Sequence, residues 1–307
     1  MNRSAPVALF AFNRPKHTAA VLDALGANSE ARDTPLLVFS DGPRNDEDIK
    51  SITEVRQVIS KTRGFRDVML IKREQNLGLA KSIVQGVSEV CESYGRVIVL
   101  EDDIVVSPYF LNYVNDALQL YEGDERVLSV GCYTFPVSQE LPETFFLKLP
   151  DCWGWAVWKR AWDLFEPDGT KLLTQIRVQG LEERFDLDGA YPYTQMLAKQ
   201  VGGENDSWAI RWYAKAFLLN KLTLYPGRSV TRNVGMDGSG IHSGCSSHYE
   251  VEISRVPIKV CPVEIEEHVQ ARAAFSAFLG QHKGNFVQFA QARFWGLLER
   301  GKRFLEL

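Results

Sequence analysis

The chain has 307 residues, of which 45% are hydrophobic and 24% are charged, and its formal net charge at pH 7 is -4. This length and apolar content suit one large α/β domain with appendages, or two closely joined domains. The slightly negative charge and the lack of a dominant basic tract argue against a nucleic-acid partner.

Strand-like and helix-like segments alternate through the first third of the chain. Apolar runs predict buried strands, and apolar residues at three- and four-residue spacing predict the helices between them. The strands are expected at 6–12, 35–40, 68–72 and 96–100, and the helices at 16–26, 46–61 and 79–94. Such alternation predicts a mostly parallel sheet with right-handed crossovers, whose ligands bind beyond the carboxyl ends of the strands.

The pattern becomes less regular after Pro108. Helices are expected at 110–121 and 208–219, a strand at 127–133 and mostly helical structure over 170–203. The stretch 228–247 is rich in glycine, which predicts a mobile loop. The amphipathic stretch 286–307 has two open interpretations. It is either a core-packed or homodimer helix, or a helix that lies on the cytoplasmic face of a membrane and would suit a lipid-linked acceptor.

Cysteine usage and hydropathy bear on the cellular compartment. The five cysteines are scattered and lack CxxC spacing, which is typical of a reducing compartment and argues against a structural zinc site. A disulfide between two of them stays open. The N-terminal apolar run is too short for a signal peptide, and no run of about eighteen apolar residues predicts a membrane span. We therefore expect a cytoplasmic protein, peripheral at the membrane if the last helix binds there.

The run VIVLEDDIVV at 97–106 is the most informative stretch. Its apolar start reads as a strand buried on both faces, and Glu101, Asp102 and Asp103 follow at the carboxyl end. Like charges this close raise each other's pKa unless a cation or hydrogen-bond donor intervenes. A bound divalent metal, with further oxygen ligands from water and phosphate, resolves the repulsion. This indicates phosphate chemistry, most simply on a nucleotide.

Further polar groups follow the other predicted strands. Asn13 and Arg14 come after the first strand, Asp41 after the second and Asn76 after the third. Because the carboxyl ends of parallel strands meet at one edge of a sheet, these groups are expected to converge with the acidic run.

Six motifs in a fixed order resemble nucleotide-sugar-dependent glycosyltransferases of the GT-A fold. They are FNRP at 12–15, SDG at 40–42, NLGLAKS at 76–82, VLEDDIVVSPYFLNY at 99–113, WGWAVWKRAW at 153–162 and NDSWAIRW at 205–212. The chain resembles family 2-type enzymes of bacterial surface polysaccharide synthesis, and also eukaryotic N-glycan β-1,2-N-acetylglucosaminyltransferases. The resemblance implies a Rossmann-like GT-A domain over 1–257, with a nucleotide-binding half at 1–133 and an acceptor half at 134–257. The remainder, 258–307, is expected to be a helical extension.

The resemblance also implies roles for the acidic run. Asp103 would hold Mn2+ or Mg2+, which bridges the donor diphosphate and offsets charge on the departing nucleotide. Asp102 would contact the ribose or the donor sugar, and Glu101 would support both. The alternative is an acidic turn that binds nothing. His242, in the glycine-rich stretch, would be a further metal ligand or a diphosphate contact, against the alternative of a loop histidine without a role.

Other donor contacts are implied around the first three strands. Asn13 and Arg14 would bind uracil or the phosphates, where Arg offers a fork of donors, and the alternative for Arg14 is a surface salt bridge. Asp41 would contact the base or ribose, and the alternative is an Asp-Gly turn held by local hydrogen bonds. Asn76 opens a helix whose backbone N–H groups can meet anions, or that is simply capped there. Lys81 could reach a phosphate or stay solvated.

Asp206 is the candidate catalytic base. Inverting transfer needs a carboxylate that takes the proton of the acceptor hydroxyl as it attacks the anomeric carbon. The family shows Glu-Asp here with an Arg five residues after the Asp, whereas this chain has Asn205, Asp206 and Arg211. If the base were the missing first acid, Glu204 would be next in line. The alternative for Asp206 is the N-cap of the following helix.

Tryptophans mark the acceptor half. Trp153, Gly154 and Trp155 are expected to form a wall for the acceptor or donor sugar, because aromatic faces pack on sugar C–H faces. The alternative is core packing, since tryptophans bury large areas in any fold.

The function implied is an inverting, metal-dependent glycosyltransferase that moves a sugar from a nucleotide-diphosphate donor, by family habit UDP. Its acceptor would be a hydroxyl of a saccharide or lipid-linked molecule. A nucleotidyltransferase is one alternative, but the chain lacks a glycine-rich basic loop after the first strand. A sugar-nucleotide-binding protein without catalysis is another, and Asn205 in place of an acid favours it mildly.

Overall fold

The structure is a computed structural model that describes residues 4–236 and 247–282. The first half runs β1 (Val7–Ala11), α1 (Pro15–Gly26), η1 (Ala31–Asp33), β2 (Pro35–Ser40), α2 (Asp46–Lys61), β3 (Asp67–Lys72), α3 (Leu79–Tyr94), β4 (Arg96–Glu101), β5 (Ile104–Val106), α4 (Phe110–Leu120) and β6 (Val127–Gly131). The second half runs β7 (Thr144–Leu147), β8 (Trp155–Trp158), α5 (Lys159–Trp162), α6 (Gly169–Val178), α7 (Glu182–Phe185), α8 (Tyr193–Val201), α9 (Trp208–Leu218), β9 (Leu222–Pro226), β10 (Thr231–Asn233) and α10 (Val269–Gln281).

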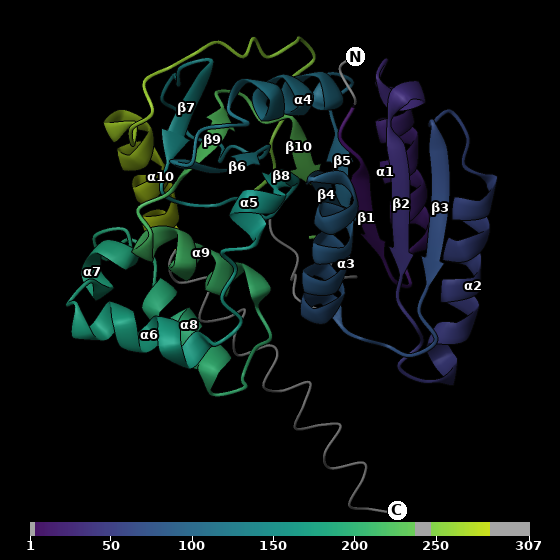
Figure 1. Cartoon of the computed structure of the whole chain (residues 1–307), viewed down its shortest axis with the longest axis horizontal. Helices are drawn as coiled ribbons and strands as arrows, with labels where there is room; N and C mark the ends of the chain where they lie inside the picture. Colours follow the sequence, from purple (N-terminus) through teal and green to yellow (C-terminus); the bar gives the residue numbers. More distant parts are fainter. Residues whose placement is uncertain (1–3, 237–246, 283–307) are drawn as a thin grey trace, which may run out of the picture.

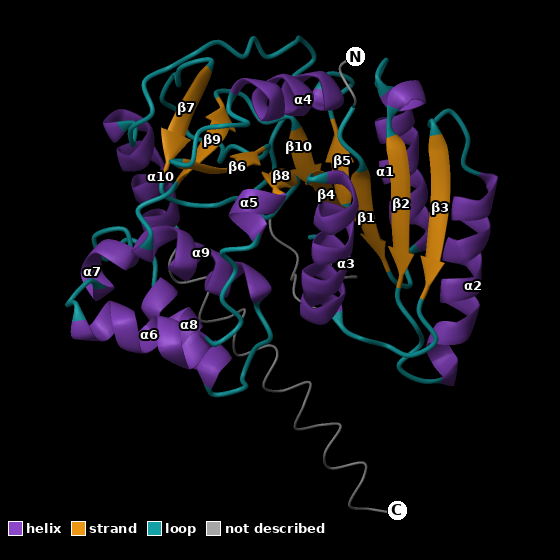
Figure 2. Ribbon diagram, in the orientation of Figure 1, coloured by secondary structure: helices purple, strands orange, loops and turns teal. Residues whose placement is uncertain are grey.

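Among the described residues, eight strands form one sheet in the order β3-β2-β1-β4-β8-β6-β9-β7. The first four pair in parallel, as do β6 and β9, while β8 is antiparallel to both of its neighbours and β7 is antiparallel to β9. Strands from both sides of position 133 therefore belong to one sheet. Helices cover both of its faces (Figures 1 and 2). The predicted α/β class, with a mostly parallel sheet flanked by helices, is confirmed.

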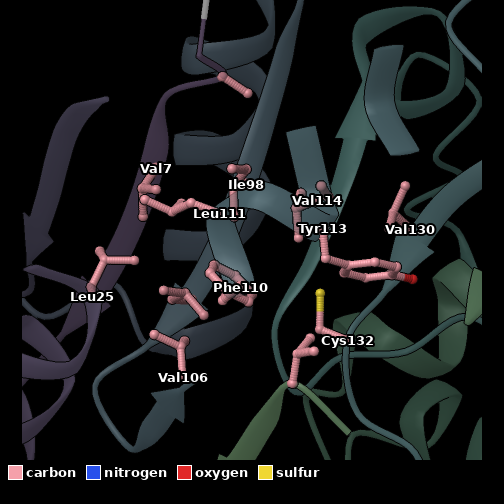
Figure 3. Close-up of a cluster of buried hydrophobic side chains, with 14 of the residues drawn as sticks. Val7, Leu25, Ile98, Val106, Phe110, Leu111, Tyr113, Val114, Val130 and Cys132 are labelled. Carbon is pink, nitrogen blue, oxygen red and sulfur yellow. The ribbon is translucent and has the colours of Figure 1, made fainter. Parts of the chain in front are cut away.

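Strands β1, β2 and β4 are largely buried on both faces because their side chains alternate between two hydrophobic clusters. In β1, Val7 and Leu9 belong to a cluster with α1, α2 and α4, whereas Ala8 and Phe10 belong to a second cluster with α3 and α9. Figure 3 shows part of the first cluster, where Tyr113 of α4 lies beside β6 and donates its hydroxyl to the carbonyl of Gly131 (3.0 Å). The parallel pairing of these strands places the carboxyl ends of β1, β2 and β4 along one edge of the sheet.

A third cluster organises the second half of the chain. It joins β7 and β9 to α6, α8, α9 and α10, and α10 contributes Phe275, Phe278 and Leu279. Ile258 is buried in the first cluster, so the start of the predicted extension packs onto the body of the protein. Residues 283–307 of that extension, which include the amphipathic stretch 286–307, lie outside the described residues.

Some of the helices and strands were predicted from the sequence and others were not. The strands and helices expected before Tyr121 all form, within a few residues at their ends. Four strands, β5, β7, β8 and β9, were not predicted, and the expected loop 228–247 contains a further one, β10, which pairs antiparallel with β5. Within 4–236 and 247–282, no helix is both long and apolar enough to cross a bilayer.

Candidate functional site

The acidic turn lies at the end of β4, in the middle of the sheet. Glu101 is the last residue of β4, Asp102 and Asp103 form the turn, and β5 begins at Ile104. Because β1 pairs with β4 up to Phe10 opposite Glu101, the residues that follow β1 reach this turn. The backbone N–H of Phe12 donates to Asp102 Oδ2 (3.1 Å). The sheet order thus brings the first and fourth strand ends together, as the sequence predicted.

Arg14 is the residue that closes this junction. Its Nη2 forms an ion pair with Asp102 Oδ1 and a second with Asp103 Oδ2 at 2.9 Å. The side chains are mostly buried, with Arg14 18% and Asp103 12% exposed. Burial alone would lower the pKa of Arg14, but the two carboxylates outweigh it and the pKa is raised. Arg14 is therefore held as a cation between two acids.

One guanidinium does not balance the charge of the turn. Burial raises the pKa of Glu101 well above its usual value, and the neighbouring charges of Asp103 and Asp102 raise it further. Burial also raises the pKa of Asp102, although Arg14 works against this shift. The repulsion between these carboxylates adds to the effect of burial, and a further cation bound at the turn would relieve it.

Whether a divalent metal suits the site can be tested on its ligands. Across the described ranges, no three His, Cys, Asp or Glu side chains gather in a group that could hold a metal ion. The carboxylate oxygens and the unbalanced negative charge do fit Mg2+ or Mn2+, which take oxygen ligands and complete their shell with water and phosphate. The described chain thus offers a carboxylate anchor, Asp103, rather than a complete cage. His242, the other expected ligand, lies outside the described residues.

Asp41, expected to touch the nucleoside, is used inside the protein. Its Oδ1 accepts from the N–H groups of Gly42 and Leu77, both at 2.9 Å. Its Oδ2 accepts from Asn76 Nδ2 and the N–H of Gly78, both at 3.0 Å. Only 8% of the residue is exposed. Asp41 therefore braces the turn before α3 against the end of β2, which favours the structural alternative.

The same bonds bear on the start of α3. The N–H groups of Leu77 and Gly78 point at Asp41, so these two donors are already engaged and do not face an anion. Lys81 is exposed on the first turn of α3. This exposure leaves Lys81 free to reach a phosphate, and it equally fits a lysine that contacts only water.

Asn13 turns toward the start of α2. Its Nδ2 donates to Asp48 Oδ1 (2.8 Å), and Arg44 pairs with the other oxygen of Asp48 at 2.8 Å. Arg44 also lies over the ring of Phe12, 4.9 Å from its centre. The Arg44 hydrogen bonds lower the pKa of Asp48 to about 2. Sequence reasoning missed Arg44 and Asp48, whose only signal is a polar run after the second strand.

Asp206 lies just before α9, and its side chain is 67% exposed. Ser207, not Asp206, caps the helix by accepting from the N–H of Ile210 (3.2 Å), so the N-cap alternative for Asp206 is wrong. The indole of Trp208 stacks on Trp155 at 5.2 Å, and Trp155 pairs with Val99 of β4. The start of α9 therefore lies at the carboxyl edge of β4.

The contacts of Asp206 remain few. Arg211 Nη2 lies 3.7 Å from its Oδ1, in the spacing that the family resemblance implied. In the part of the chain that the structure describes, no hydrogen bond or ion pair joins Asp206 to the acidic turn. Glu204, the other candidate, is also exposed.

The tryptophan motif divides into core and surface. Trp155 is 1% exposed and sits in the second cluster with Trp162, Trp208 and Trp212, a placement that favours packing over contact with a sugar. Gly154 has a φ of 87° and its missing side chain faces Thr231. Trp153 keeps exposed surface and packs edge-on against Tyr133 at 4.6 Å. It is the member of the motif that can still meet a ligand.

Asp151 is a residue that sequence reasoning missed. It is buried, its Oδ2 accepts from the N–H groups of Cys132 and Tyr133 (both 2.8 Å), and its Oδ1 accepts from Trp153 (2.9 Å). Burial raises its pKa to about 6, although these hydrogen bonds work in the opposite direction. Asp151 fastens the Trp153 turn to the end of β6, and nothing in its sequence context distinguishes it from other loop aspartates.

Comparison with known proteins was made by sequence and by structure. No family model matches the chain, and no curated protein matches it. Mannosyltransferase PcManGT from Pyrobaculum calidifontis, in complex with GDP-Man and Mn2+, has 12% identity and a TM-score of 0.37, over 70% of this chain and 74% of that one. TarS from S. aureus has 10% identity and a TM-score of 0.30, over 45% of this chain and 23% of that one.

A second structure of S. aureus TarS, residues 1–349, has 11% identity and a TM-score of 0.41. It matches over 74% of this chain and 59% of that one, so this chain spans less than two thirds of either TarS structure. At such low TM-scores, these similarities do not decide the family or the activity.

Proposed function

We propose that this protein is an inverting glycosyltransferase that uses a nucleotide-diphosphate sugar. The observation that carries the proposal is the junction of Arg14 with Asp102 and Asp103 at the carboxyl edge of a mostly parallel sheet. It combines a forked cation for phosphate with an excess of carboxylate charge for a metal. The fixed order of the six sequence motifs, from FNRP to NDSWAIRW, supports the same reading.

The donor is proposed to lie along this edge, with its diphosphate at Arg14 and Asp103. UDP is the nucleotide that the resemblance favours. Asp103 would hold Mn2+ or Mg2+ through its carboxylate, with His242 as a further candidate ligand. When bound, the metal would supply a positive charge against the diphosphate as it departs. Arg14 would share that task through its guanidinium, and Lys81 and the exposed part of Glu101 remain candidate contacts.

Asp206 is proposed to act as the base. In a direct displacement, the acceptor hydroxyl loses its proton to the Asp206 carboxylate while its oxygen forms a bond to the anomeric carbon. The bond from that carbon to the diphosphate oxygen breaks, and the nucleoside diphosphate leaves with the electron pair. The high exposure of Asp206 is compatible with this role because an acceptor must approach from solvent.

The acceptor is proposed to be a saccharide or a lipid-linked saccharide, as in surface polysaccharide synthesis. Trp153, the partly exposed member of its motif, offers an apolar face for a sugar ring.

Differential scanning fluorimetry of the full chain tests the donor class. UDP, GDP, CMP and dTDP sugars are added with and without Mn2+. A ligand that binds the folded state raises the melting temperature by mass action, and we expect a Mn2+-dependent rise with a nucleoside-diphosphate sugar. No shift with any of these nucleotides, with or without metal, would overturn the proposal.

A further inference from the structure

The segment after β10 lies directly against the ion pair of Arg14 and Asp103. Gly235 is buried, and a Cβ at this position would collide with Asp103 Oδ2. The same Cβ would lie 2.8 Å from Arg14 Nη1 and 2.9 Å from Asp103 Cβ. Real side-chain atoms essentially never approach so closely, so any other residue here would move one or both partners of the pair.

The backbone cannot retreat easily from this contact. Asn233 pairs with Ile104 in the β5–β10 ladder, and the N–H of Val234 donates to the carbonyl of Asp103 (2.8 Å). Thr231 Oγ1 donates to the carbonyl of Trp153 (2.7 Å), which fixes the other side of the strand. The segment is therefore tied both to the acidic turn and to the tryptophan motif.

The glycine is not required by backbone conformation. Gly235 does not have the positive φ found at Gly154 and Gly78, so it is not held in the left-handed region that favours glycine. A side chain is excluded at this position because Asp103 and Arg14 occupy the space where its Cβ would lie. This separates a steric role toward the pair from a general role in the turn.

We propose that Gly235 is a positioning residue. By leaving space beside the ion pair, it keeps the Arg14 guanidinium and the Asp103 carboxylate in the relative position that the donor diphosphate requires. This inference rests on the proposed function, because the pair is the proposed diphosphate and metal anchor. Gly235 itself touches no reacting atom. It acts through the two side chains against which it packs.

A double-mutant cycle between Gly235→Ala and Arg14→Ala tests the proposal on the full chain. Calorimetric titrations with UDP and with GDP, each with MnCl2, measure affinity in all four proteins. Displacing a charge-assisted contact should weaken binding by about tenfold when Gly235→Ala is made in the wild type. In the Arg14→Ala background the same substitution should cost at most about twofold, because the guanidinium is absent and the Asp103 carboxylate, no longer held by Arg14, can move away from the added methyl.

Two glycines provide matched controls. Gly123→Ala places a methyl in open space, and we expect no change in affinity or melting temperature. Gly227→Ala directs a methyl at the carbonyl of Pro142, away from the ion pair. It should lower the melting temperature equally in the wild-type and Arg14→Ala backgrounds.

The melting temperatures of the ligand-free proteins give an independent readout. Gly235→Ala should lower the melting temperature less in the Arg14→Ala background than in the wild type, in contrast to Gly227→Ala. Equal losses in both backgrounds, or no loss in either, would overturn the proposal. If the wild type binds neither nucleotide with Mn2+, the proposed function fails, and the stability cycle still decides whether Gly235 acts through Arg14.

Discussion

Asp41 and Asn76 lie 35 positions apart in the sequence, and a 3.0 Å hydrogen bond from Asn76 Nδ2 to Asp41 Oδ2 joins them. Both were candidates for contact with the nucleotide. Instead they hold two strand ends together, since Asp41 also accepts from the N–H groups of Gly42, Leu77 and Gly78. Residues at the ligand edge of a parallel sheet can thus build the edge itself, and under the proposed function the donor would be bound by their neighbours.

Replacing Asp41 should therefore cost stability. Asp41→Ala leaves four donors without their acceptor, three of them backbone N–H groups, and we expect the free energy of unfolding to fall by about 2–4 kcal/mol. Urea unfolding of the ligand-free protein measures this. Asp33→Ala, at an exposed aspartate paired with Arg32 at 3.9 Å, is the control and should change little. If Asp41→Ala unfolds at the same urea concentration as the wild type, Asp41 does not stabilise the turn before α3.

Much of the sheet could be predicted because burial on both faces leaves a simple signature. PLLVFS and VIVL are continuous apolar runs, and they became β2 and most of β4. The strand WAVW was missed because four aromatic and small residues read equally well as core packing. Its position between β4 and β6, antiparallel to both, depends on pairing partners far away in the sequence.

The site could be predicted only in part, for a similar reason. That Arg14 would approach Asp102 and Asp103 follows from the expected meeting of strand ends. Both carboxylate oxygens of Asp41 accept hydrogen bonds because the turn before α3 lies against the end of β2. No local sequence pattern predicts this contact. The importance of Gly235 and Asp151 is likewise a matter of what lies opposite them in space.

The Asp103 carboxylate should be the source of any metal dependence. Asp103→Asn keeps the shape of the side chain but removes its charge, while Arg14 still pairs with Asp102. We expect the chain to stay folded and its affinity for a nucleoside diphosphate to become the same with and without Mn2+. Asp163→Asn, at the exposed Lys159 ion pair, should retain the Mn2+ effect. Titration calorimetry measures both, and a Mn2+ effect that persists in Asp103→Asn would assign the metal elsewhere.

Asp151 should give the protein a pH-dependent stability. Its pKa is raised from 3.8 to about 6, so the folded state binds a proton that the unfolded state has released between these values. The sign follows: its contribution is fully present below pH 3.8 and is lost as pH rises through about 6. The difference amounts to about 2–3 kcal/mol.

The measurement compares urea unfolding of the wild type and Asp151→Asn across that pH window. Asp151→Asn should be less stable at low pH, because its amide cannot accept all of the backbone hydrogen bonds. It should also lack the part of the pH slope that belongs to Asp151. Parallel pH curves for the two proteins would contradict the assignment.

Asp206→Asn should separate binding from transfer. The side chain is exposed and caps nothing, so the substitution should leave the melting temperature unchanged within experimental error. Donor affinity should also persist, since no contact in the described chain ties Asp206 to the acidic turn. Transfer should fall by about 10²–10⁴-fold, the usual loss when a general base is removed.

Glu204→Gln is the matched control, because Glu204 is a nearby exposed acid and the second candidate. With the donor that the fluorimetry identifies, transfer is measured as release of the nucleoside diphosphate in the presence of acceptor. If Asp206→Asn retains full transfer while Glu204→Gln loses it, the base is Glu204. If neither substitution affects transfer, neither exposed carboxylate accepts the proton, and the catalytic base does not lie at the start of α9.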